Sequence, residues 1–432
     1  MKLFSRLFST AIAPETKTSR AYAAAYYEVP DAVWSPRTYE SFSKEGYKIN
    51  VVAYQAIRKI ADSIGAMNWK AFDASGLHVK THPFLALIEK PNPWQSGAEW
   101  WRAKISYLLL EGQGFDECVR GSGQTPVELW TLRPDRMTVK LAPTGVPRGY
   151  EYGAGKNKLF YPADPQTGKS DIRHVMLFDP LNEWSGQSPI EAAAYGIDQH
   201  NECMKWQQAL IQNSARPSGA MMMDKETTMS DEQFQRLRDE VEQNFSGAAN
   251  AGRPMLLEGG MKWQAMSFSP ADMDILEQKN SAARDISLGF GVPPLLLNIP
   301  GDNTYSNYRE ARLGFFEDTV IPLANMLAQE LNYWLSEDFG GTTIKPDYDS
   351  IEAIAEKRMQ LWEMVDASDE ITVNEARELK GYPALPPPLG NMLMADLRSS
   401  RRGHMSPKDE NGVEQGVDPS DKVLGELAYG KE

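Results

Sequence analysis

The sequence predicts an α+β protein in which two long helices flank a small module and connect it to a larger mixed body. Three observations indicate this fold. Capped, helically periodic segments recur along the chain, a central stretch is β-prone with frequent Gly and Pro, and two long polar helices enclose about 55 residues. The 432 residues have room for about two to four domains.

Residues 1–48 contain scattered aromatic residues without a period, so we expect an irregular N-terminal arm. This segment is basic, rich in Ser and poor in acidic residues at its start. It lacks the apolar core of a secretory signal. We interpret it as a flexible or docking arm.

Two amphipathic helices are predicted next. The first follows Asn50, a favourable N-cap, and ends near Gly65, where a C-terminal cap is expected. The second begins after Ser96, which forms a capping box with Glu99, and continues to about Glu111. Both helices carry an apolar stripe, so both should pack on a core.

The chain then changes to a β pattern. Gly121–Gly123 reads as a hairpin turn, and three short segments are β-prone, at Val127–Leu132, Met137–Leu141 and Ile172–Phe178. Together with the two helices they predict a mixed unit over residues 49–187.

The segment 188–213 is predicted to be the first long helix. Ser188 caps it, Pro189 suits its first position, and Glu191 completes a capping box. Its 25 or so residues would extend roughly 37 Å. Apolar positions are sparse after Ile197, so this helix should pack against copies of itself or line a channel.

Residues 214–268 predict a small β-α-β-β module, with Ser230 and Gln233 as the capping box of its helix. Such a module is marginal as an independent core. Residues 269–289 then predict the second long helix.

A Gly- and Pro-rich loop is expected at 290–307, overlapping a helix from about Tyr305 to Leu335 that Pro322 should kink. A further helix is predicted near Ser350–Val365, which closes a second mixed segment, residues 308–370.

Residues 371–432 form the last predicted part. A capping box at Thr372 and Glu375 opens a short helix, and the tail from His404 is polar and acidic.

The composition limits the function. The formal net charge is −14, which excludes a general nucleic-acid binder whose affinity comes from a basic surface. It is compatible with a protein that DNA slides past. Two cysteines do not form a disulfide framework, and no apolar stretch reaches the roughly 18 residues of a membrane span.

The search for catalytic chemistry favours no enzyme. Thr167–Ser170 resembles the end of a phosphate loop, but Ala163 stands where the motif needs Gly, and a strand-like segment follows. His200 and Cys203 share a helix face, but no second ligand pair accompanies them. We therefore expect no catalytic residue, no metal and no cofactor.

Eight segments, in order, carry a resemblance to a known family: HPFLALIEKPNPWQSGAEW (82–100), LLLEGQGFDECVR (108–120), PVELWTLRPDRMTV (126–139), GQSPIEAA (186–193), NSARPSGAMM (213–222), SPADMDILEQKNSAARDISLGFGVPPLLL (269–297), NTYSN (303–307) and ITVNEAR (371–377). Over about residues 49–390 the chain resembles portal proteins, the head–tail connectors of tailed double-stranded-DNA bacteriophages and of related gene transfer agents. A departure is EGQGF, where many relatives have a Gly-Asn-Ala-Tyr-like sequence.

The resemblance implies a portal-type subunit with an α/β wing, a two-helix stem, a small α/β clip and a helical crown, assembled in a ring of usually twelve. It assigns the wing to 49–187 and 308–370, the stem to 188–213 and 269–289, the clip to 214–268, the tunnel loop to 290–307, and the crown with its tail to 371–432. Twelve copies at −14 each would carry about −168, and part of that charge would repel DNA in the channel.

The resemblance also implies partners and sites. The ring would lie in the virion at one capsid vertex, after assembly in the host cytoplasm. It would contact the terminase large subunit, head–tail adaptors, the major capsid protein and passing double-stranded DNA, without a membrane. The candidate site residues are Asn303, Thr304, Tyr305 and Asn307 in the tunnel loop, Lys205, Lys279 and Arg284 lining the stem channel, and Lys225, Arg253 and Lys262 for clip docking.

Three alternatives remain. Another head–tail or minor capsid protein would share the acidic composition without needing paired helices around a module. A packaging nuclease or ATPase would need the phosphate loop or carboxylate cluster that the sequence lacks. A binding module for cellular partners explains less of the layout.

Overall fold

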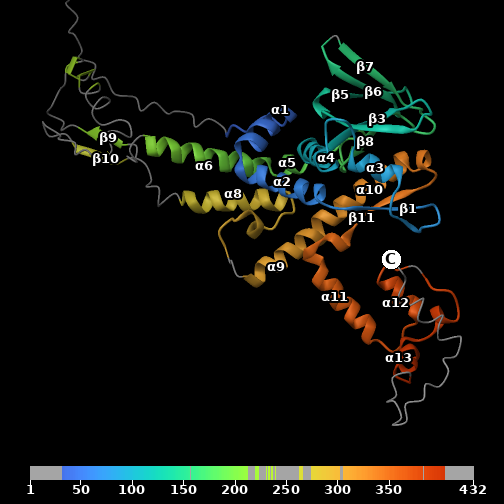
Figure 1. Ribbon diagram of the computed structural model, residues 1–432. Helices are drawn as coiled ribbons and strands as arrows, with labels where there is room; N and C mark the ends of the chain where they lie inside the picture. Colours follow the sequence, from blue (N-terminus) through green and yellow to red (C-terminus); the bar gives the residue numbers. More distant parts are fainter. Residues whose placement is uncertain are drawn as a thin grey trace, which may run out of the picture.

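A mixed α/β body carries a projecting pair of antiparallel helices on one side and a smaller C-terminal helical part on another (Figure 1). The coordinates are a computed structural model. The structure describes residues 32–155, 157–212, 219–222, 230, 232–233, 235–236, 239, 262–265, 274–301, 305–382 and 384–403. The predicted α+β class is confirmed.

Two early helices form the centre of the core. Helix α2 (Val51–Gly65) is capped by Asn50, as predicted, and continues through Gly65, since the cap residue is Ala66. Helix α4 (Gly97–Glu111) has the predicted capping box. The two helices pack on each other through fully buried apolar side chains, which are Ala53, Ile57, Ile60 and Ile64 of α2 and Trp100, Trp101, Ile105 and Leu108 of α4.

A buried ion pair connects this core to the neighbouring sheet. The ammonium of Lys104 on α4 contacts the carboxylate of Asp116, and both side chains are almost completely buried. Thr131 donates a second hydrogen bond to Asp116, 2.7 Å long. Lys104 also lies 5.1 Å from the centroid of the Trp100 ring. The charges are therefore paired rather than orphaned, which a buried charge requires.

The β-rich part comprises antiparallel sheets. In one, strand β3 lies between β4 and β8, and the turn predicted at Gly121–Gly123 connects β3 to β4. A second sheet has the order β5-β6-β7, and a third the order β11-β1-β2. The strands are β1 (Trp69–Phe72), β2 (His78–Val79), β3 (Gln113–Arg120), β4 (Pro126–Leu132), β5 (Met137–Leu141), β6 (Pro147–Ala154), β7 (Asn157–Pro162), β8 (Ile172–Met176) and β11 (Thr343–Pro346).

Part of the predicted N-terminal arm is helical. The expectation of irregular structure up to residue 48 is wrong for α1 (Tyr39–Ser41) and the π-helical segment η1 (Phe42–Ile49). Phe42 is buried, and Gly46 lies so close to Ile190 that a Cβ there would be 2.4 Å from its Cδ1 atom. The segment is ordered by these contacts with distant parts of the chain, which local periodicity does not report.

The long helix predicted from Tyr305 to Leu335 is present with an irregular centre. It comprises α9 (Tyr305–Gly314), a π-helical segment η5 (Phe315–Val320) and α10 (Ile321–Leu335). Pro322 lies just after the π segment. Because Pro has no N–H to donate, the widened turn falls where the α-helical hydrogen-bond pattern would be broken.

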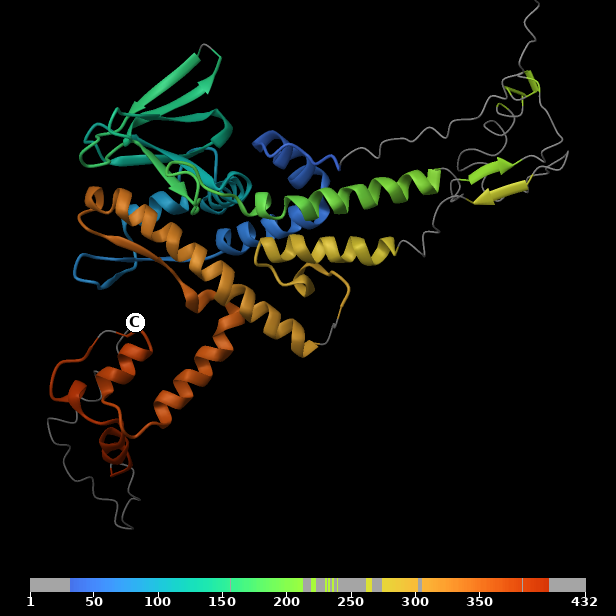
Figure 2. The same ribbon diagram turned by 180° about the vertical axis from the view of Figure 1, so that it is seen from behind.

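The remaining elements complete the body and the C-terminal part (Figures 1 and 2). The capping box predicted at Thr372 and Glu375 opens α12. No helix among the described residues is long and apolar enough to span a membrane. The remaining bounds are α3 (Pro83–Glu89), η2 (Pro134–Arg136), η6 (Glu337–Phe339), η7 (Tyr348–Ser350), α11 (Glu352–Ala367), α12 (Val373–Leu379), η8 (Leu389–Asn391) and α13 (Met394–Gly403).

Candidate functional site

The projecting helix pair consists of α6 (Ala194–Gln212) and α8 (Ile275–Gly289), which lie side by side and antiparallel (Figure 2). The single helix predicted from Ser188 is interrupted at Ala193, so that a short α5 (Pro189–Ala192) precedes α6. Ser188 caps α5 as predicted, by accepting a hydrogen bond from the Glu191 N–H over 3.2 Å, whereas the described contacts do not include the return bond from the Glu191 side chain that would complete the predicted capping box. Helix α8 begins later than the predicted residue 269, because Asp274 has a left-handed backbone, with φ 47°, that an α-helix cannot continue through.

Small residues allow the two helices to approach closely near the body. A Cβ on Gly196 would lie 3.2 Å from the Ala282 carbonyl oxygen. A Cβ on Gly289 would lie 3.0 Å from the Cβ of Ala193. Close backbone approach and buried apolar side chains such as Ile197 and Ile286 therefore hold the inner half of the pair together.

A buried polar network fixes the base of α6. Asn50, the cap of α2, donates from Nδ2 to Oδ1 of Asn201 over 2.9 Å. Asn201 in turn donates to the carbonyl of Glu45 over 3.1 Å. His200 lies beside Asn50, with 3.2 Å between its Nδ1 and the Nδ2 of Asn50. Burial, assisted by the charge of Lys279, lowers the pKa of His200.

The network agrees with a structural role for His200, and burial agrees with the same role for Cys203. Both residues are buried. Among the described residues no group of three His, Cys, Asp or Glu side chains is placed to hold a metal ion.

The outer half of α6 is exposed. After Cys203 no residue of the helix is buried, and the apolar side chain of Ile211 is 69% exposed. Of the predicted channel-lining residues, Lys205 is exposed and pairs with Glu202 over 2.8 Å. This agrees with the sparse apolar pattern, because the described residues leave a large face of the helix uncovered.

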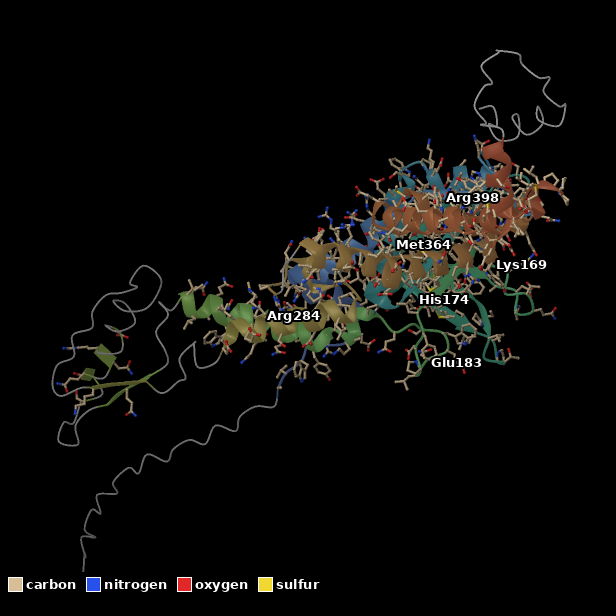
Figure 3. The ribbon with its side chains drawn as sticks, turned by 90° about the horizontal axis from the view of Figure 1, so that it is seen from below. Lys169, His174, Glu183, Arg284, Met364 and Arg398 are labelled. Carbon is tan, nitrogen blue, oxygen red and sulfur yellow. The ribbon has the colours of Figure 1, made fainter. Side chains whose placement is uncertain are left out.

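The loop after α8 is tied to its surroundings. It contains the 3-10 segment η4 (Pro294–Leu297). Arg284 of α8, labelled in Figure 3, donates to the carbonyl of Pro300, and Ser287 donates to that of Val292. Thr319 of η5 donates to the carbonyl of Gly291 over 2.6 Å. Arg284 therefore holds the loop in this chain, in addition to any role facing a channel.

The remaining predicted site residues are distributed as follows. Tyr305 and Asn307 belong to α9, so the predicted loop 290–307 ends before Tyr305. Asn303 and Thr304 lie outside the described residues, as do Lys225 and Arg253. Lys262 is exposed on β10 (Lys262–Ala265), which pairs antiparallel with β9 (Gly219–Met222) at the far end of the helix pair (Figure 2).

Within the predicted small module, the capping box is confirmed. Ser230 and Gln233 exchange two hydrogen bonds, of 3.0 and 3.3 Å. The strand predicted at Pro254–Leu257 lies outside the described residues.

The Thr167–Ser170 segment is a surface turn. Asp164 accepts a 2.6 Å hydrogen bond from the Thr167 hydroxyl, and Gly168 has a left-handed backbone with φ 68°. Strand β8 follows, not a helix. The arrangement offers no helix N-terminus to a phosphate, as expected.

Sequence reasoning missed the contacts that position the helix pair. The bonds from Asn50 to Asn201 and from Thr319 to Gly291 connect residues 151 and 28 positions apart. The available signal was the position of Asn50 before a helix, which identified it as a cap. Its second role depends on which helix lies beside it.

Comparisons with known proteins agree on one family. The family model described as "Phage portal protein" matches residues 51–381. An uncharacterized protein of Rickettsia bellii is 41% identical over 79% of this chain and 89% of its own length. The portal protein of Enterobacteria phage HK97 is 24% identical over 71% of each chain. A chain from the neck of a native gene transfer agent (GTA) particle, computed with C12 symmetry, is 40% identical, with a TM-score of 0.62, covering 81% of this chain and 95% of that one.

Proposed function

This chain belongs to the phage portal protein family, and on that premise we propose that its copies form a ring-shaped channel at one capsid vertex, through which double-stranded DNA is packaged and ejected. The resemblance identified in the sequence is thereby confirmed. The setting is the virion, and the phage and GTA necks of its relatives support it.

The observation that carries the proposal is the helix pair α6 and α8. It projects from an α/β body, its outer half is exposed, and the β9–β10 pair lies at its far end (Figure 2). In one chain this arrangement leaves apolar side chains such as Ile211 and Leu276 in water. Adjacent copies in a closed ring would cover such faces, because head-to-tail contacts close into rings when the rotation allows it.

The domain assignments follow from this reading. The wing comprises 49–187 and 308–370, the stem 188–213 and 269–289, and the clip 214–268. The segment Tyr39–Ile49 contacts both α2 of the proposed wing and α6 of the proposed stem, and we group it with the wing. The crown begins at 371. The C12 symmetry of the related neck supports twelve subunits.

The partners are proposed by the same logic. The clip would contact the terminase large subunit during packaging and head–tail adaptors afterwards, with Lys225, Arg253 and Lys262 as candidate contacts. The wing would face the major capsid protein. The candidate residues that DNA would pass are Asn303, Thr304, Tyr305 and Asn307 in the tunnel loop and Lys205, Lys279 and Arg284 in the stem.

We further propose that the chain is structural and not an enzyme. Its family is a structural one, and the phosphate-loop-like turn at Thr167–Ser170 has no helix behind it. The second candidate function, a packaging nuclease or ATPase, would need a helix N-terminus after Thr167–Ser170, and β8 follows there instead.

The test is the mass and shape of the purified protein, by native mass spectrometry and negative-stain imaging. The expected species is a ring of about twelve 48.4 kDa subunits with a central hole. Within particles, deletion of 298–307 should spare the ring and impair DNA packaging or retention. A chain that stays monomeric in particles would contradict the ring. A deletion variant that packages and retains DNA normally would contradict the tunnel-loop assignment.

A further inference from the structure

An open groove lies beside the loop that follows α8. Its volume is about 700 Å³. One wall is the polar face of α2, and the other is formed by α9 and the start of η5. Leu296, Leu297 and Asn298 close one end, and the buried ring of Phe315 contributes to the apolar floor. The groove is thus formed by two helix faces and the loop 290–301.

The described residues that line this groove carry mostly positive charges, in a chain whose net charge is −14. Among the described residues of the lining, the cationic side chains are Arg58 and Lys59 of α2 and Arg312 of α9, and the carboxylate is that of Asp62. Asp62 is already shared between Arg58, at 3.1 Å, and Arg102, at 2.6 Å. It therefore has little capacity left to neutralise the other two cations.

The two remaining cations are poorly compensated. Arg312 contacts Glu352 over 3.2 Å, but that carboxylate is 85% exposed, and an exposed pair contributes little. Lys59 is half-buried, and no hydrogen bond or ion pair reaches its ammonium from the described residues. Burial and the neighbouring charge of Arg312 both lower the pKa of Lys59. An anion placed between Lys59 and Arg312 would stabilise the charged form of Lys59 and so offset both the burial and the repulsion from Arg312.

We propose that this groove binds phosphate groups of double-stranded DNA through Lys59 and Arg312, one groove per subunit of the ring. The inference rests on the proposed function, since it needs DNA to pass the loop that closes the groove. A guanidinium and an ammonium are the side-chain groups that hold backbone phosphates without reading sequence. Tyr308 and Asn298 add hydrogen-bonding groups to the same lining.

We favour DNA over an acidic protein segment as the occupant, because the groove lies beside the loop that DNA would pass in the proposed channel. The groove shares Leu296–Asn298 with the loop that Arg284, Ser287 and Thr319 hold in place. A ring of such grooves would grip DNA at one level, whereas the acidic remainder of the chain would let it slide. Local contact and overall repulsion together would retain packaged DNA without stopping its movement.

The experiment compares assembled rings that differ in two charges. The variant Lys59→Gln/Arg312→Gln is matched by Lys158→Gln/Lys169→Gln, which removes two exposed cations of the body. A third variant, Lys59→Arg/Arg312→Lys, keeps both charges and changes only the shapes of the two side chains. Binding of a short fluorescent duplex is measured by anisotropy at several salt concentrations, and ring mass by native mass spectrometry.

The expected result is an intact ring with weaker DNA binding, and a slope of log affinity against log salt that is lower by about 1 to 2 than in the matched control. The charge-preserving variant should bind like the wild type. If the ring assembles but the groove variant and the matched control have equal affinity and slope, the inference is wrong. Loss of the ring only in the groove variant would also overturn it, because the cations would then be pairing with a neighbouring subunit. If the double variant does not fold, Arg312→Gln alone should give about half the change in slope.

A wild-type chain that forms no ring in particles would instead refute the proposed function.

Discussion

Asn50 Nδ2 donates a hydrogen bond to Oδ1 of Asn201 across 2.9 Å, although the two residues are 151 positions apart. The Oδ1 atom of Asn50 accepts hydrogen bonds from the backbone N–H groups of Val52 and Ala53. One buried amide therefore starts helix α2 and fixes the base of α6. The orientation of the projecting helix pair on the body depends on a side chain that local rules identify only as a cap.

We expect Asn50→Ala to lower the free energy of unfolding by about 2 to 4 kcal/mol, because it removes a cap and leaves the buried Asn201 side chain without its donor. Asn50→Ser keeps a capping hydroxyl that is too short to reach Asn201, so it should cost less, about 1 to 3 kcal/mol. Urea unfolding followed by tryptophan fluorescence measures both. Wild-type stability in Asn50→Ser would show that the bond to Asn201 contributes nothing.

Local signals were enough to predict much of this fold. The capping boxes at Ser96, Ser230 and Thr372 were predictable because a box needs two residues three positions apart. The strands of residues 126–132 and 137–141 were predictable from β-prone runs bounded by turns.

Other elements could not be predicted locally. Strand β1 is four residues long, and its pairing partner β11 places Trp69 opposite Pro346, far along the chain. Strand β6 contains Gly149 and Gly153, which weaken a strand signal. The groove cations Lys59 and Arg312 come from different helices, so no spacing in the sequence connects them. Non-local packing decides these features.

Gly196 should be intolerant of a large side chain. A Cβ there would lie 3.2 Å from the Ala282 carbonyl oxygen, so Gly196→Leu must push α6 and α8 apart. We expect a loss of about 1 to 3 kcal/mol, despite the better helix propensity of Leu. Ala209→Leu, at an exposed position of the same helix, is the control and should be nearly neutral in thermal unfolding. Equal melting temperatures for the two variants would contradict close packing at Gly196.

Thr319 should restrain the loop after α8. Thr319→Val keeps the shape of the side chain and removes its 2.6 Å hydrogen bond to the Gly291 carbonyl. We expect hydrogen exchange of residues 290–301 to accelerate about fivefold to tenfold, the equivalent of roughly 1 kcal/mol. Thr138→Val, at an exposed position on β5, is the control. Unchanged exchange in the loop would mean that Arg284 and Ser287 hold it without help from Thr319.

Glu111 should make stability depend on pH near neutrality. Burial, followed by the nearby charge of Asp135, raises the pKa of this carboxyl at the end of α4 to about 7. The folded state therefore holds a proton that the unfolded state releases at lower pH, so this group lowers stability as the pH rises from about 4.5 to about 7.

Glu111→Gln removes that titration and can keep a hydrogen bond to Gln113. We expect the variant to be more stable than the wild type at pH 8 by about 1 kcal/mol, a figure reduced for partial solvent screening, and the difference to vanish below about pH 4.5. Glu183→Gln removes an exposed carboxylate at the edge of the body and is the control (Figure 3). Urea unfolding at a series of pH values provides the measurement. If the stability of Glu111→Gln follows that of the wild type in parallel over this range, then Glu111 is ionised in the folded protein at neutral pH and its neighbours tolerate the charge.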